Sequence, residues 1–98
     1  LESAPVVSID EIETCYYIRC FVKDHSGVLA KVTAIFAESN ISMENVHQEP
    51  SVEKPDDATL VMITNSVLES KMNEALLSLA QLDAIDGDIM RIRLETLG

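Results

Sequence analysis

The four residues Asp24-His25-Ser26-Gly27 are the part of this chain best suited to chemistry. They bring together a carboxylate, an imidazole, a hydroxyl and a glycine where a strand pattern stops and a helix pattern starts. A glycine in such a turn lets the backbone approach a ligand closely, and the free N–H groups of a helix start attract anions. We therefore expect a binding site at this turn.

The residue types at the turn match the two charges of a small zwitterion. The N–H groups of Val28 and Leu29 can donate to a carboxylate, and Asp24 can accept from an ammonium. Asn45, in the next predicted strand, offers both a donor and an acceptor. Together these groups describe an amino-acid pocket. An alternative of equal weight is that Asp24 only caps the helix and Gly27 only completes the turn.

Other chemistries fit the turn poorly. Ser26 beside His25 has no evident third partner, and neighbours in sequence seldom point at each other, so nucleophilic catalysis is not predicted. A phosphoryl site would need an arginine where Asp24 and His25 stand. His25 and His47 lack a defined carboxylate partner, so we predict no metal site and no catalytic residues in this chain.

The first half of the chain must position this turn. Two-residue alternation predicts a strand over residues 14–23, and helical spacing predicts a helix over 28–39 with Ser26 as a possible N-cap. Asn40 is a plausible helix end. A less regular second strand over 41–48 requires a bulge near Glu44-Asn45. Residues 49–57 contain two prolines and several charges, which predicts a loop.

The second half repeats the pattern. An apolar run predicts a third strand over 58–64 that is central or buried on both faces. Ser66 and Glu69 have the spacing of a capping box ahead of a second helix. Asp86-Gly87 predicts a turn before a last strand over 88–95, with Met90, Ile92 and Leu94 on one side and Arg91, Arg93 and Glu95 on the other.

The predicted order is βαββαβ, the ferredoxin-like plan of the α+β class. Right-handed crossovers place both helices on one face of a four-stranded antiparallel sheet. Tyr17 and Phe21 then lie on the uncovered face beside Arg19 and Lys23. This arrangement indicates either a surface for association or scattered surface hydrophobic residues.

Composition bounds the remaining choices. The 98 residues allow one domain, and 17 acidic residues against 7 Lys and Arg give a net charge of −10, which opposes nucleic acid and anionic membranes. No apolar run approaches the roughly 20 residues of a membrane span. Cys15 and Cys20 point to opposite faces of one strand, so they do not bridge, and a reducing cytoplasm is expected. Residues 1–13 are interpreted as a connecting arm of a longer protein.

The motifs resemble a known family. The chain is similar to ACT domains, regulatory modules that bind amino acids between paired domains, in Tyr16-Tyr17-Ile18-Arg19, Asp24-His25-Ser26-Gly27-Val28-Leu29-Ala30, Ile35-Phe36 and Asn40-Ile41-Ser42-Met43. Ser26 stands where their turn more often has proline. More narrowly, the chain resembles the C-terminal region of bacterial homoserine dehydrogenases in the pattern from Ile9 to Arg19, in Ile41 to Pro50, and in Leu82-Asp83-Ala84-Ile85.

This resemblance implies that residues 1–13 lead from an absent catalytic region and that residues 14–98 form the ACT regulatory domain. The parent would be an NAD(P)-dependent, cytoplasmic enzyme that reduces aspartate semialdehyde to homoserine. This fragment, which has no Gly-x-Gly-x-x-Gly motif, would itself be neither catalytic nor cofactor-binding. It would pair in a homo-oligomer and sense threonine, giving feedback control of aspartate-family biosynthesis, including threonine and methionine.

The ligand site implied by the resemblance centres on the turn. The residues carried over are Asp24, His25, Ser26, Gly27, Val28 and Leu29, with Asn45 and Gln48 completing the site from a strand of this or a paired domain. The competing hypothesis is a structural dimerisation module that binds no small molecule.

Overall fold

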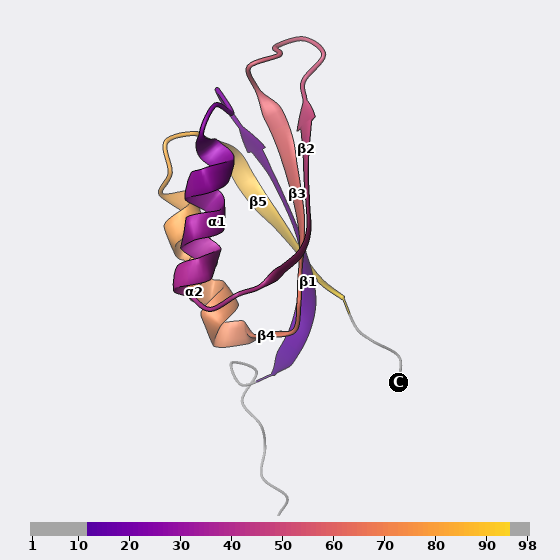
Figure 1. The fold of residues 1–98 in the computed structure, drawn as a ribbon, viewed down its shortest axis with the longest axis vertical. Helices are drawn as coiled ribbons and strands as arrows, with labels where there is room; N and C mark the ends of the chain where they lie inside the picture. The colour runs from indigo at the N-terminus through magenta and orange to yellow at the C-terminus, as the bar shows by residue number, and fades with distance from the viewer. Residues whose placement is uncertain (1–11, 95–98) are drawn as a thin grey trace, which may run out of the picture.

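The computed structural model describes residues 12–94. In chain order, the elements are β1 Glu13–Val22, α1 Val28–Glu38, β2 Met43–Pro50, β3 Ala58–Thr64, β4 Val67–Leu68, α2 Glu69–Ala80 and β5 Ile85–Leu94. Both helices lie on the same side of the sheet (Figure 1). The predicted α+β, ferredoxin-like plan is therefore confirmed, with one short strand, β4, that the sequence did not predict.

The sheet has β1 and β3 at its centre and β5 and β2 at its edges. β1 pairs antiparallel with β3 on one side and with β5 on the other, and β2 pairs antiparallel with β3. β4 follows β3 along the same side of β1, because Ile63 pairs with Tyr17 and Val67 with Thr14. The Thr64 hydroxyl accepts the Tyr16 N–H at 3.1 Å where the ladder shifts between these two strands.

The core lies between the sheet and the helices. Alternation in β1 places Tyr16, Ile18, Cys20 and Val22 in this layer, as predicted. They meet two groups of buried residues: Val28, Val32 and Phe36 of α1, and Met72, Ala75 and Leu79 of α2. β3 is central, which confirms one of the two alternatives predicted for it, and its helix-facing side is the one that is fully buried.

The opposite face of the sheet is left without helices. Phe21, Met90 and Ile92 are each close to half exposed there. Their register joins them into one patch, since Tyr17 pairs with Ile92, and Arg19 pairs with Met90. The predicted exposure of the Tyr17 and Phe21 face is confirmed. The last strand also alternates as predicted, with Met90 and Ile92 on this open face and Arg91 toward α2.

Several predicted boundaries change. β1 begins and ends one residue earlier than expected, and α1 ends at Glu38. The backbone at Asn40 has a φ of 59°, which confirms a left-handed helix end there. β2 begins at Met43 instead of residue 41, and the predicted bulge is confirmed between Met43 and Asn45. β2 continues to Pro50, which shortens the predicted loop to residues 51–57.

Three local predictions were wrong because tertiary contacts overrode local patterns. Asp86-Gly87 is not a separate turn but an irregular part of β5, where Gly87 has a φ of 78°. Leu68, not Ser66, is the N-cap of α2, and no capping box forms. Gly27, not Ser26, is the N-cap of α1. Most of the predicted arm at residues 1–13, and Glu95, lie outside the described residues.

The buried thiol of Cys20 predicts a pH dependence of stability. Burial raises the pKa of Cys20 from its ordinary value of 9.0 to about 11. Between these values the unfolded chain loses the thiol proton while the folded chain keeps it. The free energy of unfolding should therefore fall by about 1.4 kcal/mol per pH unit as the pH rises from about 9 to 11, and this contribution is fully present below pH 9.

Urea unfolding at a series of alkaline pH values measures this slope. Cys20→Ala removes the titrating group, so the variant should lose stability less steeply with pH than the unmodified chain. Parallel slopes for the two proteins would contradict the assignment to Cys20.

No helix among the described residues is both long enough and apolar enough to cross a bilayer.

Candidate functional site

The turn between β1 and α1 is built from two left-handed residues. Asp24 has a φ of 47° and Gly27 a φ of 73°. The Val28 N–H donates to the His25 carbonyl at 3.1 Å, so this N–H closes the turn. Val28 and Leu29 were both expected to offer a free N–H to a ligand carboxylate, but the N–H of Val28 is already used within the turn. The side chain of Leu29 is partly buried and packs against the core.

Position 27 favours glycine because its backbone is left-handed, and not because neighbouring atoms leave no room for a side chain. A methyl group built at this position meets no atom within 4 Å. Gly27→Ala should therefore cost only the left-handed conformation, about 1–2 kcal/mol of unfolding free energy. Urea denaturation measures the loss. Gly27→Asn is the matched control, because asparagine tolerates positive φ and should cost less than alanine. Equal losses for both variants would contradict this explanation.

His25 ties the turn to the loop that follows β2. Its backbone N–H donates to the Asp56 carbonyl at 2.7 Å, and its ring Nε2 lies 3.2 Å from the Pro55 carbonyl. The Gln48 amide Nε2 lies 2.9 Å from His25 Nδ1. Because a carbonyl oxygen can only accept, the contact with Pro55 requires that Nε2 donates. The structure thus brings together His25 and Gln48, two of the predicted site residues.

Asp24 is held by the same loop. Its backbone N–H donates to the Asp57 carboxylate at 3.1 Å, while its side chain remains exposed. The carboxylate of Asp24 is therefore free to face a ligand, although its backbone is fixed by neighbours far away in the sequence.

A pocket lies on the other side of the turn, against the segment that leads from α2 to β5. Asp24, Ser26 and Val28 line it from the turn, and Gln81, Leu82, Asp83 and Ala84 line it from that segment. Lys23 and Lys31 add two cationic side chains. Lys23 lies 3.8 Å from Asp86, so Lys31 is the cation better placed to meet an added anion. The wall offers both signs of charge.

Asn45 does not join this pocket within one domain. It pairs with Ile63 and lies on the open face of the sheet, whereas Gln48 pairs with the buried Leu60 on the helix side. The sequence-predicted residues therefore lie in different places. Asp24, Ser26 and Val28 line the pocket, whereas Gly27 shapes the turn and Leu29 packs against the core. His25 contacts Gln48, and Asn45 lies on the open face of the sheet.

The family model described as ACT domain matches residues 16–83, which include most of β1, the turn, α1, β2, β3, β4 and α2. The chain belongs to the ACT domain family. The structure shares its fold at a TM-score of 0.65 with the ACT domain of a GTP pyrophosphokinase from Chlorobium tepidum, at 11% identity.

This ACT domain is similar to one region of homoserine dehydrogenases, which are longer proteins. It is 35% identical over 97 residues to a homoserine dehydrogenase of Pseudomonas aeruginosa, covering 99% of this chain and 22% of that protein. The crystal structure of a homoserine dehydrogenase from Thiobacillus denitrificans matches with a TM-score of 0.87 and 35% identity, over 100% of this chain and 21% of that one. The chain thus spans about a fifth of the length of these relatives.

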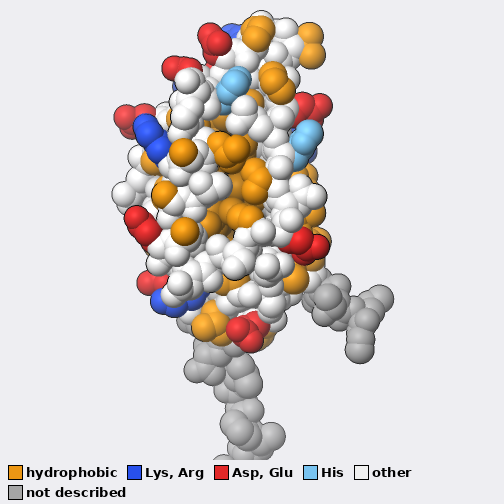
Figure 2. All heavy atoms as spheres, in the orientation of Figure 1, with side chains coloured by type: hydrophobic (Ala, Val, Ile, Leu, Met, Phe, Trp, Pro, Cys, Tyr) orange, Lys and Arg blue, Asp and Glu red, His pale blue; other side chains and the backbone are white. Residues whose placement is uncertain are grey.

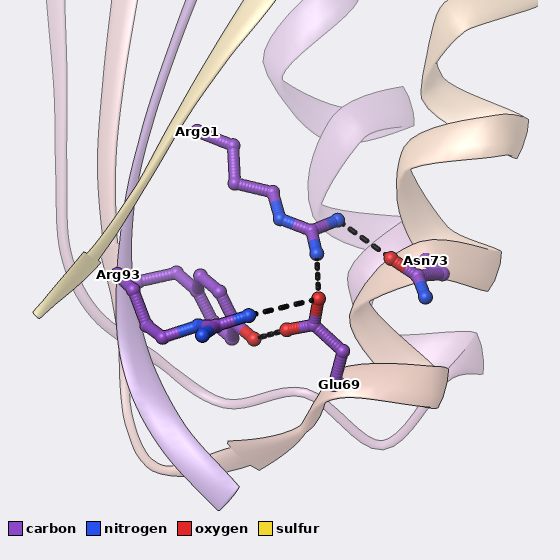
Figure 3. A network of polar contacts seen from close by, with 5 residues as sticks. Glu69, Asn73, Arg91 and Arg93 are labelled. Carbon is purple, nitrogen blue, oxygen red and sulfur yellow. Dashed lines mark hydrogen bonds and ion pairs between the residues drawn. The ribbon is translucent and has the colours of Figure 1, made fainter. Parts of the chain in front are cut away.

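A polar network that the sequence interpretation missed joins α2 to β5 (Figure 3). The Glu69 carboxylate accepts hydrogen bonds from the Tyr16 hydroxyl and from Arg91, and lies 3.2 Å from Arg93. Arg91 also donates to Asn73 at 2.6 Å. A signal for this network was present, because Glu69 continues the helical stripe of Met72, Ala75 and Leu79, which are buried. An acid on that stripe needs cationic partners.

Within residues 12–94, no group of three or more His, Cys, Asp and Glu side chains is arranged to hold a metal ion.

Proposed function

We propose that this ACT domain senses threonine and regulates a homoserine dehydrogenase of which it is a part. The observation that carries the proposal is the match to homoserine dehydrogenases over nearly the whole chain, with the acidic turn of Asp24 and Gly27 included. The rest of the parent enzyme would supply the reduction of aspartate semialdehyde with NAD(P) in the cytoplasm, since residues 1–98 contain only three glycines and no dinucleotide-binding motif.

The pocket beside the turn supports a zwitterionic ligand. The Asp24 carboxylate can accept from the ligand ammonium, with Asp83 as a second anion in the same wall. Lys31 and the Ser26 hydroxyl can meet the ligand carboxylate. A neutral or singly charged ligand would leave one of these charged groups without a partner, which favours an amino acid.

Two such domains would pair along the β2 edge. Hydrophobic side chains gather in the hollow between α1 and β2 (Figure 2). The partly buried Leu29 belongs to α1, and the partly buried Met43 and Val46 belong to β2. A second domain laid against the β2 edge would cover this strip and bring its own Asn45 toward the first domain. Residues 1–13 would then serve as the arm to the catalytic region, and 14–98 as the regulatory unit.

Regulation would follow by linkage. If threonine binds one arrangement of the paired domains more tightly than another, it shifts the enzyme toward that arrangement by the ratio of the two affinities. The bonds from His25 to Gln48 and to the 51–57 loop connect the turn directly to β2, the edge at which the domains would pair.

A structural dimerisation module remains the second candidate. The half-exposed Phe21, Met90 and Ile92 on the open face favour it, because such a patch is covered when copies associate. In that case the turn would bind no ligand, and assembly would not depend on amino acids.

Isothermal titration calorimetry of the 98-residue chain with threonine tests the proposal. Valine is the matched control, because it has the same shape and both backbone charges but lacks the hydroxyl. We expect saturable heat with threonine and weaker binding of valine. Sedimentation velocity with and without threonine tests the linkage to pairing. No heat at about 10 mM threonine, together with an unchanged dimer, would support the dimerisation module instead.

A further inference from the structure

Asp24 has a left-handed backbone, which a residue with a side chain adopts rarely and keeps where its surroundings hold it. Its φ is 47°, a region that costs free energy for residues other than glycine. Asp24 also lines the pocket proposed for threonine. Because the backbone of a residue fixes the direction of its Cα–Cβ bond, whatever holds this conformation also sets where the Asp24 carboxylate points.

The loop at residues 51–57 holds this part of the turn. The Asp57 carboxylate accepts the Asp24 N–H at 3.1 Å, and the Asp56 carbonyl accepts the N–H of the next residue, His25, at 2.7 Å. The loop and the turn lie at the same end of the molecule (Figure 1). Of these two bonds, only the one to Asp24 uses a side chain, so a substitution can remove it and leave the backbone contact in place.

Asp57 is itself fixed within the loop. Its N–H donates to the Lys54 carbonyl at 2.8 Å, and its carbonyl accepts the Ser51 N–H at 2.8 Å. The Ser51 hydroxyl accepts the Lys54 N–H at 3.3 Å, so the loop also bonds to itself. Asp57 is partly buried, whereas the neighbouring Asp56 is exposed. The loop therefore presents the Asp57 carboxylate to the turn in a defined position.

We propose that Asp57 is a positioning residue for the ligand site at the turn. Its carboxylate holds Asp24 in the left-handed conformation that directs the Asp24 carboxylate toward the ligand ammonium, an inference that rests on the function proposed above for this pocket. The loop joins β2 to β3, so a movement of the β2 edge on pairing reaches Asp24 through Asp57. Ligand affinity then depends on pairing, and pairing on the ligand, by the same factor.

Amide hydrogen exchange, followed by NMR on the 98-residue chain without ligand, tests the hold of Asp57 on Asp24. Asp57→Ala removes the acceptor, so the Asp24 amide should exchange about fivefold faster, as expected for the loss of one hydrogen bond. Asp57→Asn keeps an accepting oxygen and should keep most of the protection. Asp56→Ala is the matched control, because it removes a neighbouring carboxylate and leaves the carbonyl that His25 uses. Unchanged exchange at Asp24 in Asp57→Ala would overturn the proposal.

Calorimetry with threonine tests the consequence for the site. We expect Asp57→Ala to weaken threonine binding about fivefold, and Asp57→Asn and Asp56→Ala to stay within about twofold of the unmodified chain. Asparagine and alanine both remove the charge of Asp57, so a rescue by asparagine attributes the effect to the hydrogen bond and not to the charge. Unchanged affinity in Asp57→Ala, or equal losses in Asp57→Ala and Asp57→Asn, would also overturn the proposal.

The exchange measurement distinguishes a failure of this inference from a failure of the proposed function. If the unmodified chain binds no threonine, the proposed function fails, and exchange at Asp24 alone decides whether Asp57 holds the turn. If the unmodified chain and Asp57→Ala bind threonine equally well, the proposed function stands and the positioning role of Asp57 fails.

Discussion

Glu69→Ala is expected to destabilise the domain by about 3 kcal/mol, the low end of the cost of removing one partner from a buried ion pair. The Glu69 side chain is 8% exposed and receives hydrogen bonds from Tyr16 and Arg91. Its removal leaves the fully buried Tyr16 hydroxyl without an acceptor and two guanidinium groups without a counter-charge. Because Arg91 and Arg93 are partly exposed, water recovers part of the loss, and the low end of the range applies.

Thermal and urea denaturation measure this effect. For a domain of this size the loss corresponds to a fall in Tm of about 15 °C. Glu74→Ala is the matched control on the same helix, because Glu74 makes only an exposed pair with Lys71 at 3.5 Å and should cost well under about 1 kcal/mol. Similar losses of stability in Glu69→Ala and Glu74→Ala would show that the contribution of Glu69 to stability does not come from its buried partners.

A double-mutant cycle separates the Tyr16 hydrogen bond from the rest of the network. Tyr16→Phe removes only the hydroxyl, and we expect a loss of about 1–2 kcal/mol, since Glu69 keeps its two arginine partners. In the Glu69→Ala background the same change should cost much less, because the acceptor is already gone. Additive losses would contradict a direct interaction between these two residues.

Asp24→Asn is expected to lower threonine affinity by at least about tenfold, if the pocket at the turn is the site proposed above. The change removes the negative charge that would pair with the ligand ammonium and keeps the shape of the side chain. Asparagine also tolerates the left-handed backbone of Asp24, whose φ is 47°, so the turn should fold normally. Asp24→Ala would be a poorer test, because alanine adds backbone strain to the loss of charge.

Calorimetry with threonine measures the loss, and urea unfolding checks that the fold is intact. Glu38→Gln is the charge-matched control, because Glu38 is exposed at the end of α1, outside the lining of the pocket, and should leave the affinity unchanged. If Asp24→Asn binds threonine as tightly as the unmodified chain while Asp83→Asn does not, the ammonium partner is Asp83. Unchanged affinity in both variants would refute a site in this pocket.

Most of the fold could be predicted from local sequence patterns, because the spacing of apolar residues distinguishes strands from helices. Alternation in residues 16–22 places every second side chain in the core, and no distant contact is needed to read it. The bulge at Met43 to Asn45 was predictable for the same reason, since Val46 falls out of phase with Met43. The helix ends were less predictable, because Ser26 and Ser66 carry capping chemistry that the chain does not use.

The candidate site was predictable in its composition but not in its arrangement. Asp24 and Gly27 could be selected because a strand-to-helix corner with an acid and a glycine is a local feature. That Val28 closes the turn with its own N–H, and that Asn45 and Gln48 lie on opposite faces of the sheet, depends on the register between β2 and β3.

The sequence by itself determined the order of elements, the buried face of β1, the open face around Phe21 and the position of the turn. Each of these follows from periodicity or from residue types that are adjacent in the chain. The tertiary structure alone decided which charges meet. Glu69 and Arg91 are separated by 22 residues, and His25 and Gln48 by 23. Their pairing depends on how α2 packs on β5 and where the loop after β2 lies, because a polar partner is selected by distance in space and not by distance along the chain.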